Sequence, residues 1–159
     1  MNTILIVGKG NVATHLYNAF LNVDEIAVTQ ISSRDLTNIP KATITIIAVS
    51  DDAIAKVSSK ITNNFVVHTS GSVALNDLKN IKRKGVFYML QTFSKDKKVD
   101  FKEVPFCLEA ENKEDYQQLE FLAKSIGKKI YEISSEQRKT LHVAAVFVNN
   151  FTNHLFKIG

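Results

Sequence analysis

The sequence is poor in the residues that build disulfide frameworks and fibres. Its 159 residues include one cysteine (Cys107), two prolines, six glycines and no tryptophan. A single cysteine excludes an intramolecular disulfide and a cysteine metal cluster, so we expect no metal site and a reducing, cytoplasmic environment. Hydrophobic residues make up 45% of the chain and charged residues 23%. That balance is typical of one folded domain with a sizeable core.

Long apolar runs are also absent. The longest, such as LHVAAVFV at 141–148, falls far short of the roughly 18 residues that a membrane-spanning helix requires. The apolar run that begins at Ile4 has neither the basic region before it nor the small-residue cleavage site of a signal peptide. The sequence therefore predicts neither secretion nor membrane insertion.

Charge of one sign is not concentrated anywhere. Twenty lysines and arginines against sixteen acidic residues give a net charge of +4, and the basic residues gather only at 82–84 and 95–98. A nucleic-acid-binding domain presents a basic stripe or face, which this pattern lacks. We expect no nucleic-acid partner, and the surplus charge suits solubility and an anionic small ligand.

Strand-like and helical patterns alternate along the chain. Strands are expected at 3–7, 25–32, 43–49, 65–69, 86–89, 105–110 and 129–133, and helices at 11–21, 51–59 and 114–126. This order predicts an α/β, Rossmann-like, doubly wound and mostly parallel sheet. The segment 34–41 ends in Pro40 and is too short for a crossover helix, so a turn or a single helical turn is expected there. His68 lies inside the fourth run and is expected to be a packed core histidine rather than a catalytic residue.

A glycine motif joins the first strand to the first helix. GKGNVA matches G-x-G-x-x-G/A, in which Gly8 makes the tight turn, Gly10 lets the backbone approach a pyrophosphate, and Ala13 lets helix and strand pack closely. Asn11 and Val12 begin the helix, whose first N–H groups are unpaired and attract an anion. The motif predicts a dinucleotide site, and the alternative is a glycine turn that only joins two elements.

The end of the second strand indicates which dinucleotide is bound. NAD-binding folds place an acidic residue here, whereas this chain has Ser32, Ser33 and Arg34. A guanidinium can pair with a 2′-phosphate and the two hydroxyls can donate to it, so the sequence favours NADP. Two alternatives stay open: Arg34 as an ordinary solvated charge, and Asp35 in an NAD-binding register.

Two more strand ends are expected at the same edge of the sheet. Val49, Ser50 and Asp51 follow the third strand, where Ser50 or Asp51 can also cap the next helix, and Thr69 and Ser70 follow the fourth strand. We expect the first group along the inner ribose of the cofactor and the second near the nicotinamide. The alternative is that these residues only cap helices and form turns.

The last helix begins after Ser134 or Ser135 and runs without proline or glycine to Ile158. Its broad apolar face consists of Leu141, Ala144, Phe147, Val148, Phe151, Leu155 and Ile158. We expect residues 1–133 to form the dinucleotide-binding domain and residues 134–159 to begin a helical dimerisation or substrate domain. Either a second subunit, giving a homodimer, or a missing continuation covers the apolar face.

A polar stripe runs along another side of this helix. It contains His142, Asn149 and Asn153. If the stripe faces a substrate cleft, His142 is the titratable candidate for a proton donor and Asn149 a candidate hydrogen-bond donor to a carbonyl or imine. The alternative is hydrogen bonding inside a helical interface.

Several blocks together resemble a known family. GKGNVATHL, SSRD, IIAVSDDAI, HTSGS, LQTFS and AAVFVNNFTNHL resemble, in order, the Rossmann-like NADP-binding oxidoreductases with a C-terminal helical domain of unknown function. These are related in their first domain to pyrroline-5-carboxylate reductases and deazaflavin-dependent NADP reductases. The resemblance implies NADP(H) in the crevice, strand order 3-2-1-4-5-6 with extra strands beyond, and a helical domain that makes the dimer.

The chain departs from that pattern in two respects. Only the opening helix of the second domain is present, which suggests a C-terminally truncated form with little or no turnover. Val146 stands three residues before the Asn149–Asn150 pair, where related hydroxyacid dehydrogenases carry a lysine, so no catalytic lysine is expected. The sequence predicts an NADP-dependent oxidoreductase acting on a small carbonyl or imine. The alternatives are a non-catalytic NADP-binding sensor or scaffold and a domain for another nucleotide.

Overall fold

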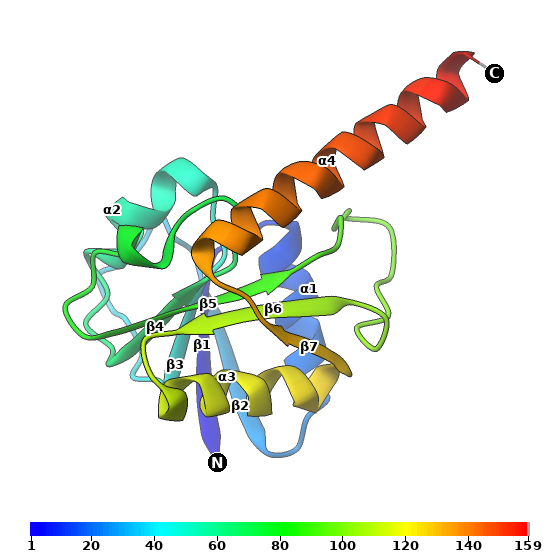
Figure 1. The fold of residues 1–159 in the computed structure, drawn as a ribbon. Coiled ribbons are helices and arrows are strands. Elements are labelled where there is room, and N and C mark those ends of the chain that lie inside the picture. Colours follow the sequence, from blue (N-terminus) through cyan, green and yellow to red (C-terminus); the bar gives the residue numbers. More distant parts are fainter. Residues whose placement is uncertain (159) are drawn as a thin grey trace.

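A seven-stranded sheet forms the centre of the molecule (Figure 1). The computed structural model describes the backbone of residues 1–158 and the side chains of residues 1–150 and 154. The strands are β1 (Asn2–Val7), β2 (Ile26–Ile31), β3 (Ile44–Ile47), β4 (Phe65–His68), β5 (Arg83–Met89), β6 (Pro105–Ala110) and β7 (Lys129–Glu132). Their order is β2-β1-β3-β4-β5-β6-β7, and every neighbouring pair is parallel except β5 with β6. The predicted doubly wound, mostly parallel α/β fold is confirmed.

The strand order implied by the family resemblance is wrong. In the order 3-2-1-4-5-6 the third strand lies outside the second, but here β3 pairs with β1 and β2 is the edge strand. The cause is the connection at 32–43, which contains turns and bends and no helix. No strand forms within it, so the chain returns directly to the opposite side of β1.

Helices cover both faces of the sheet. On one face, α1 (Asn11–Phe20) and α3 (Lys113–Ile126) pack against alternate strand residues such as Ile4 and Ile6. On the other face, Leu5 and Val7 pack against α2 (Ile54–Ser58). This face also carries the short 3₁₀ helices η1 (Asp51–Ala53) and η2 (Leu75–Asp77). Successive side chains of β1 are buried on opposite faces, as expected for a central parallel strand.

The last helix, α4 (Ser135–Ile158), is capped by Ser134. The Ser134 hydroxyl accepts from the Gln137 N–H (3.2 Å), and the Gln137 amide oxygen accepts from the Ser134 N–H (3.0 Å). This reciprocal capping box decides between the two predicted caps. It also leaves the Ser135 hydroxyl to donate to Glu109 and to accept from the Leu75 N–H.

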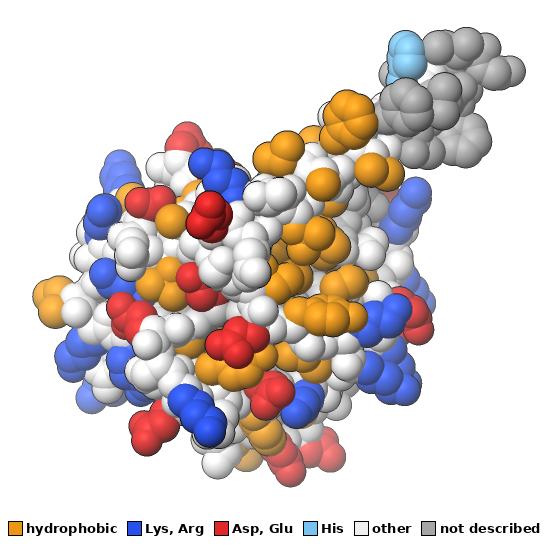
Figure 2. Space-filling view, in the orientation of Figure 1, with side chains coloured by type: hydrophobic (Ala, Val, Ile, Leu, Met, Phe, Trp, Pro, Cys, Tyr) orange, Lys and Arg blue, Asp and Glu red, His pale blue; other side chains and the backbone are white. Residues whose placement is uncertain are grey.

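Beyond its first turns, α4 extends away from the body of the molecule (Figure 1). Leu141 packs against the sheet beside Leu75 and Val86, whereas Val143 and Val148 are each 61% exposed. Figure 2 shows hydrophobic side chains gathered along this projecting helix. The predicted apolar positions Phe151, Leu155 and Ile158 lie outside the described side chains. In the part of the chain that the structure describes, no helix combines the length and apolar character needed to traverse a bilayer.

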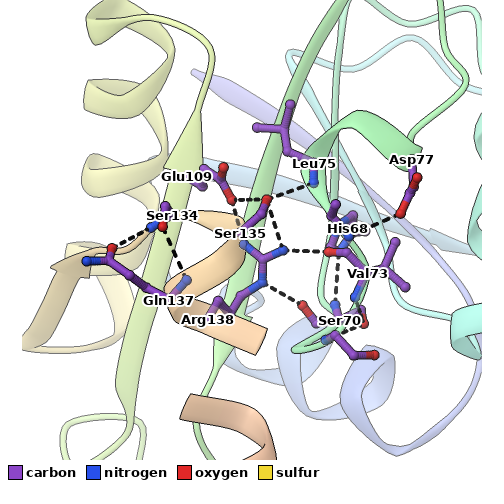
Figure 3. A network of polar contacts seen from close by, with 12 residues as sticks. His68, Ser70, Val73, Leu75, Asp77, Glu109, Ser134, Ser135, Gln137 and Arg138 are labelled. Carbon is purple, nitrogen blue, oxygen red and sulfur yellow. Dashed lines mark hydrogen bonds and ion pairs between the residues drawn. The ribbon is translucent and has the colours of Figure 1, made fainter. Parts of the chain in front are cut away.

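Arg138, in the first turns of α4, is completely buried and joins three segments (Figure 3). Its Nη1 donates to Glu109 Oε2 on β6 (2.6 Å), its Nε donates to the Ser70 carbonyl (3.1 Å), and its Nη2 donates to the Val73 carbonyl. A buried guanidinium is stable only when its charge is paired and its donors are satisfied. Arg138 therefore fixes α4 against both β6 and the loop that follows β4.

His68 lies directly beside this network and is fully buried, as predicted. Its Nδ1 accepts from the Ser70 N–H (3.0 Å), so the ring is neutral with its proton on Nε2. Burial, together with the positive charge of Arg138, lowers the pKa of His68 to about 4, although the Ala74 carbonyl and the carboxylates of Asp51 and Glu109 oppose the shift. His68 thus acts as a neutral acceptor in the core.

We predict that Arg138→Ala strongly destabilises the fold. The substitution leaves Glu109 and two loop carbonyls without their partner, and breaking a buried ion pair costs about 3 to 5 kcal/mol. Urea unfolding followed by far-UV circular dichroism measures the loss. Lys139→Ala, at the exposed neighbouring position, is the matched control and should change the free energy of unfolding by less than about 0.5 kcal/mol. A loss below about 1 kcal/mol for Arg138→Ala would contradict a structural role for the network.

We also predict that stability falls on acidification because of His68. The unfolded chain takes up this proton near the ordinary pKa of 6.5 and the folded chain only near 4. The unfolded state therefore binds more protons between these values, and the contribution is complete above pH 6.5. Lowering the pH from 7.5 to 5 should cost about 2 kcal/mol.

His68→Asn keeps an acceptor near the Nδ1 position and should remove most of this pH dependence, whereas His154→Asn, at an exposed residue, should retain it. The urea unfolding midpoints of the variants at pH 7.5 and pH 5 measure the pH dependence of stability. The prediction fails if His68→Asn and the unaltered chain show equal slopes.

Candidate functional site

A cleft of about 970 Å³ opens at the carboxyl ends of β1 to β4. Ligands of open α/β sheets bind at this edge. The lining residues are Gly8, Lys9, Gly10, Asn11, Val12, Ser32, Ser33, Arg34, Ala48, Val49, Ser50, Ala53, Thr69 and Phe93. The cleft therefore brings together most of the positions that the sequence assigns to a dinucleotide.

Gly8 and Gly10 meet different physical requirements of the motif. Gly8 has a φ of 136°, which L side chains rarely adopt, and a Cβ there would overlap the Ala48 carbonyl. Gly10 has ordinary backbone geometry, and no atom lies within 4 Å of where its Cβ would stand. Gly8 is required by the turn, whereas the missing side chain of Gly10 leaves the cleft open.

The N-terminus of α1 faces this opening. Asn11 and Val12 occupy its first positions, whose N–H groups have no carbonyl partner within the helix. The Asn11 side chain instead donates to the Phe93 carbonyl (3.3 Å), and His15 Nε2 lies 2.8 Å from the Ser94 carbonyl. These contacts hold the loop between β5 and β6 beside the cleft and leave the backbone of the first turn available to an anion.

The end of β2 presents Ser32, Ser33 and Arg34 to the cleft. The Asp35 side chain forms hydrogen bonds within its own turn. Its Oδ1 accepts from the Thr37 hydroxyl (2.7 Å) and from the Thr37 N–H (3.2 Å). These hydrogen bonds lower the pKa of the Asp35 carboxyl. Asp35 is not among the lining residues.

Sequence reasoning missed Lys9 and Phe93, which also line the cleft. Lys9 lies between the two glycines. A cation at that position of an expected phosphate-binding loop could have been predicted to face the cleft. Phe93 comes from the loop between β5 and β6, and its ring lies 5.3 Å from that of His15. Its placement depends on a contact with α1 that no local pattern reveals.

Two predicted cofactor contacts do not line the cleft. The Asp51 carboxylate accepts from the Ser72 hydroxyl (2.7 Å). Ser70 is buried, and its hydroxyl accepts from the N–H groups of Ser72 (3.1 Å) and Val73 (3.0 Å). Ser50 occupies the cap position of η1 without a side-chain capping bond. The turn chemistry named as the alternative thus accounts for Asp51 and Ser70.

A second pocket, of about 320 Å³, lies between the sheet and α4. It is lined by Tyr88, Leu90, Gln91, Thr92, His142, Ala145, Val146 and Asn149. Thr92 lines this pocket and its neighbour in the sequence, Phe93, lines the cleft, so the loop between β5 and β6 borders both spaces. Both predicted catalytic candidates, His142 and Asn149, border the smaller space.

His142 lines this second pocket and is held there by Tyr88. Its Nδ1 lies 2.8 Å from the Tyr88 hydroxyl, and the two rings meet edge to face with centroids 5.7 Å apart. Gly71, after β4, makes room for the imidazole, because a Cβ there would stand 2.9 Å from the His142 Cβ and closer still to the ring. Tyr88 was not singled out from the sequence, where a tyrosine in a strand predicts only core packing.

Comparisons with known proteins agree with this architecture. Residues 104–159 match the family model described as "Domain of unknown function (DUF2520)". No curated protein sequence gives a significant match. The crystal structure of "putative NADP oxidoreductase BF3122 from Bacteroides fragilis" is similar at 34% identity and a TM-score of 0.85, covering 99% of this chain and 70% of that one.

More distant structures share the fold alone. Protein TM1727 from Thermotoga maritima has 20% identity and a TM-score of 0.73, covering 96% of this chain and 65% of that one. The pyrroline carboxylate reductase of Plasmodium falciparum, solved with NADP bound, has 13% identity and a TM-score of 0.61, covering 99% of this chain and 70% of that one.

The identity and coverage of the Bacteroides fragilis match decide the family. The Rossmann-like sheet and the match of the C-terminal region to the domain of unknown function agree with it. The chain therefore belongs to the same family as the Bacteroides fragilis protein, and it has the fold of NAD(P)-dependent oxidoreductases.

Proposed function

We propose that the chain is an NADP-dependent oxidoreductase that transfers a hydride between the nicotinamide and a small carbonyl or imine substrate. The observation that carries the proposal is the glycine cradle at Gly8 and Gly10. A Cβ at Gly10 would project into the open cleft, at the place where a pyrophosphate meets the first turn of α1. The residues present thus fit a dinucleotide.

The preference for NADP over NAD rests on the end of β2. Ser32, Ser33 and Arg34 can hold a 2′-phosphate through hydroxyl and guanidinium donors. The NAD-binding alternative needs an acidic residue in the cleft to accept from a ribose 2′-hydroxyl, but Asp35 does not line the cleft, and its Oδ1 accepts from Thr37. Lys9 adds a second cation to the cleft.

The remaining lining residues have matching roles. Backbone groups of Val49 and Ser50 would lie along the inner ribose, and Thr69 would lie beside the nicotinamide. The bound nicotinamide supplies or accepts the hydride. His142 and Asn149 border the second pocket, where His142 can donate a proton and Asn149 a hydrogen bond to the substrate heteroatom.

The exposed side of α4 supports a further part of the proposal, a homodimer. Phe147 and Val148, which share the broad apolar face of α4, are 68% and 61% exposed. Exposed apolar patches of several hundred Å² mark interfaces more often than free surface. A second copy of the chain, packed along α4, would bury them.

The cofactor preference is tested by Arg34→Ala. Removing a charge-assisted hydrogen bond should weaken NADPH binding by about 10- to 150-fold, equivalent to about 1.5 to 3 kcal/mol, and leave NADH binding nearly unchanged. NADPH emission gives an uncluttered readout, because the chain has no tryptophan. Lys41→Ala, at an exposed residue that does not line the cleft, should bind both cofactors normally. Equal losses for NADPH and NADH in Arg34→Ala would show that Arg34 does not recognise the 2′-phosphate.

The dimer is tested by Val148→Lys. A charge placed within the apolar patch should shift the chain toward monomer by at least about tenfold in dissociation constant, because an unpaired charge would have to be buried at the interface. Sedimentation velocity over a dilution series measures the shift. Asn150→Lys adds the same charge at an exposed polar position on the opposite side of α4 from Val148 and should leave association unchanged. A monomer at all concentrations of the unaltered chain would overturn this part of the proposal.

A further inference from the structure

The contact between Tyr88 and His142 fixes which imidazole nitrogen faces the second pocket. The Tyr88 hydroxyl lies 2.8 Å from Nδ1. Gly71 is packed against the same side of the ring, where its missing Cβ makes room for Nδ1 and the His142 Cβ. Nε2 is on the far side of the ring from Gly71, and His142 lines the pocket. The nitrogen available to a ligand is therefore Nε2.

A hydroxyl is suited to hold Nδ1 in both protonation states of the ring. The Tyr88 hydroxyl oxygen can accept from Nδ1–H both in an imidazolium and in the neutral ring that remains after Nε2 has lost its proton. Burial, aided by Cys107 and Asp51 and opposed by Arg138, raises the pKa of Tyr88 to about 12. The hydroxyl keeps its proton at neutral pH, so Nδ1 stays occupied and proton exchange is confined to Nε2.

The second pocket also indicates the kind of substrate. Its lining offers a hydroxyl from Tyr88, a hydroxyl from Thr92 and amides from Gln91 and Asn149. Within the described residues, no lysine, arginine, aspartate or glutamate lines it. Among these residues the cation on offer is the His142 imidazolium, whose Nε2 proton a reacting carbonyl or imine would take, so no second cation remains to pair with a carboxylate and the lining suits an uncharged ligand.

We propose that Tyr88 and His142 form a proton-donating pair, in which His142 Nε2 protonates a small uncharged carbonyl or imine and Tyr88 positions the ring through Nδ1. The proposal rests on the proposed oxidoreductase function. In the reduction, the substrate carbon gains the hydride from the bound nicotinamide, and the electron pair of the C=O or C=N π bond moves to oxygen or nitrogen. That atom takes the Nε2 proton of the His142 imidazolium. The neutral ring keeps its proton on Nδ1, which donates to the Tyr88 hydroxyl oxygen, and water then reprotonates Nε2.

Other charged groups near the pair leave this arrangement intact. Arg138 is one turn earlier on α4 and is already bound to Glu109 on β6. The Asp51 carboxylate at η1 accepts from Ser72. Neither group forms a hydrogen bond with His142 among the contacts of the described residues, so Tyr88 is the partner that sets the tautomer.

Histidine tautomers measured by ¹⁵N NMR test the pair without turnover. At a pH where the ring is neutral, the ratio of Nδ1–H to Nε2–H in His142 should exceed that of the exposed His154 by at least about tenfold, the factor for one hydrogen bond of about 1.4 kcal/mol. Tyr88→Phe should bring His142 to the ratio of His154, and Tyr131→Phe, at a half-exposed tyrosine of β7, should not. His142→Gln assigns the signals. An unaltered ratio in Tyr88→Phe overturns the pair.

Ligand titration tests the proton donor. With NADP⁺ bound, 2-pyrrolidinone, an uncharged lactam that does not accept a hydride, should shift the ¹⁵N signal of His142 Nε2, and pyroglutamate, the same lactam with a carboxylate, should need at least a tenfold higher concentration. The shift should be lost in Tyr88→Phe. NADP⁺ binding without a shift at Nε2, or equal responses to both lactams, contradicts the proposal while the oxidoreductase function stands. Absence of NADP⁺ binding contradicts the proposed function itself, and the tautomer ratio still tests the pair.

Discussion

The arrangement of both pockets depends on the buried guanidinium of Arg138. It joins the loop after β4, strand β6 and the start of α4 through Ser70, Val73 and Glu109. Thr69, immediately before this loop, lines the cleft, and Gly71 within it receives the His142 ring. His142 is four residues after Arg138 and so lies on the same side of the helix one turn later. Fixing Arg138 therefore sets the position of His142 over the edge of the sheet.

The glycine motif and the Arg138 network have complementary roles. The motif shapes the cleft through local geometry, because Gly8 adopts a backbone conformation that only glycine takes easily and Gly10 leaves space in front of α1. The network adds a long-range constraint, since the Arg138 side chain donates to the carbonyls of Ser70 and Val73, which precede it by 68 and 65 residues. The motif thus shapes the proposed cofactor cleft, and the network positions α4 beside the second pocket.

The local parts of this structure could be predicted from the sequence, and the long-range parts could not. The alternating apolar patterns predicted the strands and helices to within two residues at each end, except that β5 begins at Arg83 rather than at 86 and the short helix η2 was not predicted. The glycine spacing located the cleft. The strand order from the family resemblance failed because the connection at 32–43 forms no further strand. Arg138 was not singled out, because an arginine in the first turns of a helix ordinarily lies in solvent. Tyr88 escaped notice because its partner is 54 residues away.

From the sequence alone, Asp35, Asp51 and Ser70 could either bind a ligand or form turns. In the folded chain their side chains bond Thr37, Ser72 and the N–H groups after Ser70. Short polar side chains commonly satisfy nearby backbone groups in this way. Arg34 has no such local side-chain partner among the described hydrogen bonds, and it lines the cleft. The distinction between a turn residue and a ligand-binding residue needed the fold.

We propose above all that the cleft binds NADP. The most direct measurement is the pair of Kd values of the unaltered chain for NADPH and NADH, obtained by titration of cofactor fluorescence under one set of conditions. NADPH is expected to bind at least about tenfold more tightly than NADH, the factor for one charge-assisted hydrogen bond of about 1.4 kcal/mol. Equal Kd values, or tighter binding of NADH, would contradict it.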